Sequence, residues 1–81
     1  MDIQLRTYRV TELNGHTATV QRSDDFIAKL CLGIAGGGFD ESQRQRATRL
    51  REALMLRGMP IGRNGCTIEL VDATAEVVTV H

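Results

Sequence analysis

The chain has 81 residues, of which 42% are hydrophobic and 25% charged, and its ten basic side chains balance its ten acidic ones. A chain of this length forms one domain, residues 1–81, and its ordinary apolar fraction argues against intrinsic disorder. No apolar run reaches the roughly 20 residues of a membrane span, and the N-terminus lacks the pattern of a signal peptide. We therefore expect a cytoplasmic protein without membrane contact.

The first predicted element is a β-hairpin that pairs residues 3–13 with residues 16–22 around Asn14-Gly15. Asn-Gly favours the type I′ turn of two-residue hairpin loops, because both of its residues need a positive φ. This loop length sets the pairing of the two strands as Leu13 with His16, Thr11 with Ala18 and Arg9 with Val20.

The same register predicts which face of the hairpin packs on the core. Alternate residues of a strand point to opposite faces of the sheet. Tyr8 and Val10 then form a small apolar spot on the more polar face. The predicted core face collects the aliphatic side chains Ile3, Leu5, Leu13, Ala18 and Val20.

Residues 24–35 fit either a helix or a strand. Ser23 is a good N-cap, Asp24 and Asp25 suit the positive end of a helix, and Gly36 can end it. One helical arc then holds Phe26, Ile27, Leu30, Cys31 and Ile34. A strand is the alternative, because the even-numbered residues from Phe26 to Ile34 are also apolar. The capping residues favour the helix.

A second helix is predicted over residues 41–57, with Asp40 as N-cap and Gly58 as the left-handed stop before Pro60. Residues 66–71 and 75–80 read as a second hairpin that turns at residues 72–74. The order ββααββ (alternative βββαββ) predicts an α+β fold: two layers, with a mostly antiparallel sheet of two β-hairpins and both helices on one face.

Residues 43–58 carry five arginines, and residues 43–63 have a net charge of +5, whereas residues 23–42 and 64–81 each sum to −3. On a helical wheel these arginines surround the helix instead of gathering on one side, which argues against a helix that reads a nucleic-acid groove. The chain also lacks an aromatic platform for single strands. Phe26 and Phe39 occupy core positions, and Tyr8 beside Arg6 is the remaining candidate ring.

The second helix and the loop after it, residues 44–61, offer a candidate partner-binding surface. Arginine beside exposed apolar side chains is a composition common in protein interfaces. The residues of this predicted surface are Arg44, Arg51, Met55, Leu56, Arg57 and Met59. The last strand is apolar on both faces over residues 77–80, so it is either central in the sheet or an edge that pairs with another copy in a homodimer.

Catalytic and metal-ligating patterns are absent from the sequence. The glycines at 36–38 precede a helix, but no GK[ST] follows them and two acidic residues occupy the place of an anion. His16 and His81 are isolated. Cys31 and Cys66 form no metal-binding cluster and are expected to be reduced and mostly buried. We expect no cofactor, no metal and no enzymatic activity.

Taken together, these patterns predict a small non-enzymatic protein-binding module. It would act as an inhibitor or regulatory adaptor that occludes a surface of a larger protein, a profile shared by small chains encoded by phages, mobile elements and bacteria. The alternative is a nucleic-acid-binding module that uses the arginine-rich second helix.

Overall fold

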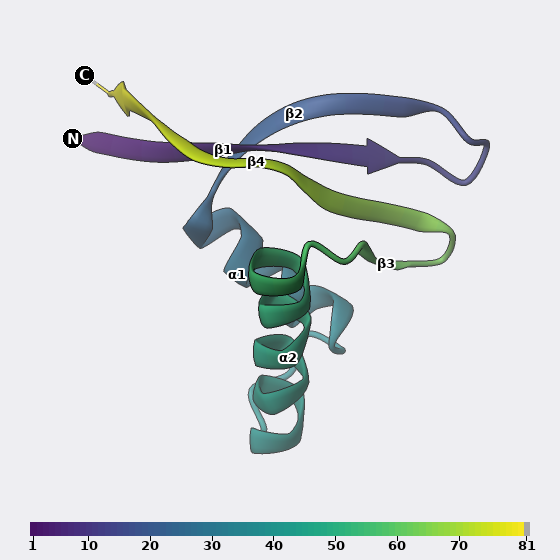
Figure 1. Cartoon of the computed structure of the whole chain (residues 1–81). Helices are drawn as coiled ribbons and strands as arrows, with labels where there is room; N and C mark the ends of the chain where they lie inside the picture. The colour runs from purple at the N-terminus through teal and green to yellow at the C-terminus, as the bar shows by residue number, and fades with distance from the viewer. Residues whose placement is uncertain (81) are drawn as a thin grey trace.

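The structure is a computed structural model that describes residues 1–80. It confirms the predicted α+β class, with four antiparallel strands and two helices in the order ββααββ. The strands lie side by side in the order β2-β1-β4-β3. Both helices lie on one face of the sheet (Figure 1). The elements are β1 (Asp2–Thr11), β2 (Thr17–Ser23), α1 (Asp24–Ile34), α2 (Glu41–Arg57), β3 (Ile61–Arg63) and β4 (Cys66–Thr79).

The capping residues place both helices where the sequence predicts them. The side chain of Ser23 accepts a hydrogen bond from the backbone N–H of Phe26 at 3.1 Å, so residues 24–34 form a helix and the alternative strand is wrong. Asp40 accepts in the same way from the N–H of Gln43 at 2.9 Å. Gly58 ends α2 with a left-handed φ of 62°. Each cap satisfies backbone groups that a helix end leaves without partners.

The first hairpin forms, but its predicted register is wrong by one residue. Its loop has three residues instead of two, because the N–H of Glu12 donates to the carbonyl of His16 at 2.8 Å. Gly15 has a positive φ of 84°, whereas Asn14 does not, which is the pattern of a longer loop closed by a left-handed glycine. Tyr8 consequently pairs with Val20.

The longer loop exchanges the two faces of β1. Tyr8 and Val10, predicted to lie away from the core, point toward the helices, and Tyr8 is completely buried. Ile3 and Leu5 alternate with them and therefore lie on the opposite face of the strand. Leu13, predicted in the core, is 77% exposed in the loop. A one-residue shift moves every side chain of a strand to the other face, which explains the whole error.

The second hairpin turns at a different place from the one predicted. Asn64 and Gly65 have φ values of 55° and 83°, as a two-residue type I′ loop requires, and they join β3 to β4. The predicted turn at residues 72–74 is instead an irregularity inside one long strand, where the register between β1 and β4 shifts. Asp72 accepts a hydrogen bond there from the N–H of Thr74 at 2.9 Å.

Arg6 joins three elements at this irregularity. Its Nε donates to the carbonyl of Ala73 in β4 at 3.0 Å, and its guanidinium forms an ion pair with Asp24 at the start of α1. The hydrogen bond to Asp24 raises the pKa of Arg6 above its ordinary value. The first turn of α1 is therefore tied to the sheet by a charge-assisted contact.

The hydrophobic core is small and lies where the helices meet the middle of the sheet. Tyr8 from β1, Ile27 and Cys31 from α1, and Leu54 from α2 are almost completely buried. They form one cluster with Ala35, Ala47, Ile61 and Ile68. The α2 axis points away from the sheet, so the turn between the helices is the part farthest from it (Figure 1). The helices therefore cover only part of the sheet.

Two glycine substitutions test how tightly β3 is held. A Cβ at Gly62 would lie 2.0 Å from the backbone oxygen of Cys66, so we expect Gly62→Ala to destabilise the fold by about 1–3 kcal/mol. Gly33 in α1 is the matched control, because a Cβ there meets nothing within 4 Å. Gly33→Ala should stabilise the protein by about 0.5–1 kcal/mol. Urea unfolding followed by circular dichroism measures both, and a Gly62→Ala variant as stable as the original chain would contradict the predicted close approach.

Candidate functional site

An apolar groove lies between α1 and the helix-facing side of the sheet, at the end that carries both hairpin turns. Its volume is about 280 Å³. Aliphatic side chains from the sheet and from α1 make up most of its wall. The lining residues are Val10, Val20, Arg22, Phe26, Leu30, Ile34, Ile61, Gly62, Arg63, Cys66, Thr67 and Ile68.

One wall of the groove comes from the apolar arc of α1. That arc is too wide for the small core to cover, so it divides between two surfaces. Ile27 and Cys31 face the core and are almost completely buried. Phe26, Leu30 and Ile34 line the groove instead, and Phe26 remains 45% exposed.

The floor of the groove comes from the sheet register. Val10 belongs to β1, the strand between β2 and β4. It pairs with Ile68 of β4, which pairs in turn with Ile61 of β3. Val20 of β2 pairs with Tyr8, so it lies on the same face of the sheet as these residues. The observed register of β1 therefore creates this floor, because it turns Val10 toward the helices. The predicted register would have turned Val10 away from them.

Two arginines supply the charge of the groove. The Arg22 guanidinium lies 5.3 Å from the centre of the Phe26 ring, within the range of a cation–π contact. Arg63 stands directly before the β3–β4 turn. The lining contains no aspartate or glutamate. The groove therefore combines an apolar interior with positive charge alone.

The structure brings together only part of the predicted surface on α2. Arg51, Met55 and Leu56 line one shallow hollow, and Leu56 is 80% exposed. Arg44 joins Arg51 in a second hollow, between the two helices. Met55 is half-buried, and its sulfur accepts a hydrogen bond from the Tyr8 hydroxyl at 3.5 Å.

The remaining two predicted residues lie at the end of α2. Arg57 is exposed in the last turn of the helix. Met59 follows the Gly58 cap, is half-exposed, and its N–H donates to the carbonyl of Ala53 at 2.9 Å. The six residues therefore form no continuous pocket, because the consecutive residues from Met55 to Arg57 point in different directions around α2.

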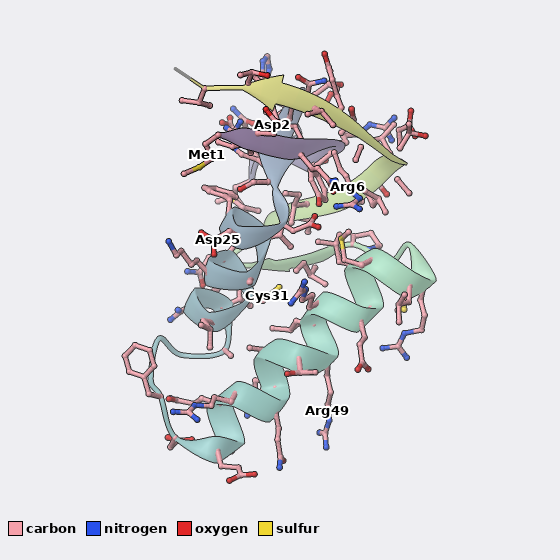
Figure 2. All side chains as sticks on the ribbon, turned by 90° about the vertical axis from the view of Figure 1, so that its left-hand side faces the viewer. Met1, Asp2, Arg6, Asp25, Cys31 and Arg49 are labelled. Carbon is pink, nitrogen blue, oxygen red and sulfur yellow. The ribbon has the colours of Figure 1, made fainter. Side chains whose placement is uncertain are left out.

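The arginines of α2 are all exposed. Figure 2 shows Arg49 extending from α2 away from the sheet. The ion pairs found within residues 1–80 join Arg6 to Asp24, Arg9 to Glu69 and Lys29 to Asp25, and none involves α2. Glu41 and Glu52 share a shallow hollow with two of the arginines, so the helix surface is mixed in charge.

Residues 1–80 contain no group of three or more His, Cys, Asp or Glu side chains placed to hold a metal ion. His16 is exposed beside the first hairpin loop, and the second histidine, His81, lies outside the described residues. In this part of the chain no helix is long and apolar enough to cross a bilayer.

No protein-family model, curated protein or solved structure matches the chain.

The groove is not among the features predicted from the sequence, although the sequence contains parts of its pattern. Phe26 and Phe39 were both assigned to the core, yet Phe39 is 76% exposed and Phe26 forms the rim of the groove. Tyr8, the predicted candidate ring for nucleic-acid stacking, is buried. An apolar arc on α1 wider than a small core can cover is the signal that points to an additional apolar surface.

The two thiols provide a direct check of this geometry. Both cysteines are free; Cys31 is buried and Cys66 is exposed at the groove, so the expectation of two mostly buried thiols holds for Cys31 only. Burial raises the pKa of the Cys31 thiol, which lowers its reactive thiolate fraction at any given pH. With a chromogenic disulfide at pH 8, we expect one thiol to react promptly and the second only on unfolding. Cys66→Ser should remove the fast phase, and equal rates for both thiols would contradict the structure.

Proposed function

We propose that the chain is a non-catalytic protein-binding module whose groove receives an apolar segment, with acidic side chains, from a larger partner protein. The observation that carries the proposal is the uncovered apolar groove, whose only charged lining residues are Arg22 and Arg63. The chain then acts as an inhibitor or regulatory adaptor by occluding the partner surface to which that segment belongs.

The size and lining of the groove favour protein side chains over a small molecule. Its volume of about 280 Å³ lies at the lower limit of the roughly 300–1,000 Å³ typical of ligand pockets. Such pockets also direct several polar groups at the ligand, whereas this lining is mostly aliphatic. Two or three apolar side chains of a peptide segment fit both the volume and the chemistry.

Charge complementarity selects an acidic segment. Arg22 is already oriented by its contact with Phe26, so it loses little conformational freedom on binding a carboxylate. The unpaired arginines of α2, including the predicted binding residues Arg44, Arg51 and Arg57, add a positive field that steers an acidic partner. The exposed Leu56 and Met59 extend the apolar contact on that side.

The proposed function belongs in the bacterial cytoplasm, with the chain encoded by a phage, a mobile element or the bacterium itself. Both cysteines are free, as is usual for proteins of a reducing compartment. Small binding modules without catalytic groups are common among such inhibitors and adaptors. This setting supports the proposal but does not carry it.

A peptide-display selection against the chain tests the proposal. We expect enriched peptides to combine large apolar residues with Asp or Glu. Affinity should fall about tenfold or more in the double variant Arg22→Glu, Arg63→Glu, because each charge reversal replaces attraction by repulsion at the groove. The matched control is Arg51→Glu, Arg57→Glu on α2, for which we expect a smaller loss. Peptides that bind both double variants with the same affinity as the original chain would contradict a role for the groove.

Nucleic-acid binding through α2 is the second candidate, favoured by its arginines that lack intramolecular ion pairs. Against it, the Arg22 guanidinium already lies 5.3 Å from the centre of the Phe26 ring, so a base that stacked on that face would have to displace it. If α2 neutralises about four phosphates, log K must fall with log salt at a slope of about −3 to −4. We expect a gel-shift titration to show no binding at physiological salt, and a slope in that range would favour this second candidate instead.

A further inference from the structure

β4 presents a free backbone edge over most of its length. β3 pairs with it only from Cys66 to Ile68, and no other strand pairs with β4 on this side in the part of the chain that the structure describes. β1 occupies the other side as far as Thr79. Beyond the register shifts, the run from Glu76 to Thr79 is regular and ready to accept another strand.

The edge from Val77 to Val80 is exposed and apolar. Val77, Val78 and Val80 are 58%, 37% and 48% exposed. Natural sheets protect their edges with lysine, proline or bulges, and this run contains neither lysine nor proline and lies beyond the irregular segment. The opposite edge of the sheet, β2, has the more polar sequence TATVQRS. Of the two long edges, β4 is therefore the one suited to pairing.

We propose that this edge pairs with the same edge of a second copy, which joins two sheets into one of eight strands. The whole molecule exposes more surface than a compact monomer of its size. Its accessible surface is 5627 Å², about 800 Å² above the roughly 4,800 Å² typical of a compact monomer of 8.9 kDa. A standard protein interface buries a similar area, about 800 Å², on each partner.

Hydrogen bonds at the chain ends set the register of this pairing. Met1 and Val80 exchange backbone hydrogen bonds in both directions, so the N–H and C=O groups of Val80 point toward β1. Because backbone groups alternate in direction along a strand, the N–H and C=O groups of Val78 also point toward β1. The N–H and C=O groups of Val77 and Thr79 point to the free side. When a two-fold axis at Val78 relates the two copies, the backbone of Val77 in each copy forms hydrogen bonds with the backbone of Thr79 in the other. The two Val78 side chains meet as the close, non-hydrogen-bonded pair.

This register is also compatible in charge and in shape. It places Glu76 opposite Val80, so no two carboxylates face each other, and Glu76 already accepts a hydrogen bond from Gln21 at 2.7 Å. Val78 pairs with Ile3, on the face of β1 that also carries Leu5, opposite to the helices. The axis brings the two copies of this apolar cluster side by side and keeps all four helices on the other face of the joined sheet.

Charge swapping at Val78 tests both the second copy and the register. The original chain should sediment as a dimer, at about twice its 8.9 kDa. Val78→Lys and Val78→Glu should each be monomeric at the same concentration, because like charges then stand directly opposite one another. An equimolar mixture of the two variants should regain the dimer, because the pair becomes complementary. This last result distinguishes self-pairing from a loss of folding.

Thr17→Lys on the β2 edge is the matched control and should remain dimeric. Circular dichroism establishes that each variant is folded; if a charged variant is not, Val77→Pro replaces it, because proline there removes only an outward-pointing N–H. Each of three results would overturn the proposal. These are an original chain that is monomeric, a Val77→Pro or singly charged variant that remains dimeric, and a mixture of the two charged variants that stays monomeric. None of these results depends on the groove, so the proposed function is tested separately.

Discussion

The burial of Tyr8 beneath α1 and α2 holds the two layers of the molecule together. This side chain comes from the middle of β1 and packs in one cluster with Ile27 of α1 and Leu54 of α2. Its hydroxyl donates to the Met55 sulfur, so the polar end of the ring is also partnered inside the protein. Arg6, two residues earlier on the same face, ties the start of α1 to the strand through Asp24. The helical layer is therefore fixed over the middle of the sheet.

A helical layer that covers only the middle of the sheet leaves the two ends of the sheet uncovered. Toward the hairpin turns, the aliphatic side chains around Val10 and Val20 remain open and form the groove together with α1. Toward the chain ends, β4 runs past the helices beside β1, with its outer edge free (Figure 1). Both proposals follow from this incomplete coverage: one surface suits the side chains of a partner, and the other suits a strand of a second copy.

Local signals in the sequence predicted the helices well, because Ser23, Asp40 and Gly58 act through contacts within a few residues. The strands were predicted less accurately, because their pairing depends on geometry that residue types leave open. Asn14-Gly15 fits a two-residue and a three-residue loop alike, and this single choice decides which face of β1 is buried. The groove depends on that face and on how much of α1 the core covers, so its location could not be predicted from residue types.

Alkaline titration of the phenol, followed by its ultraviolet absorbance, is the most direct test of this account, because Tyr8 is the only tyrosine. Burial, reinforced by the nearby Asp24 carboxylate, raises the pKa of Tyr8 above its ordinary value near 10. Its contribution to stability is therefore complete below pH 10 and is lost as the pH rises through the higher pKa of the folded state. We predict that the phenol ionises above pH 10, together with loss of the helical circular dichroism signal. Ionisation near pH 10 with that signal unchanged would contradict the account.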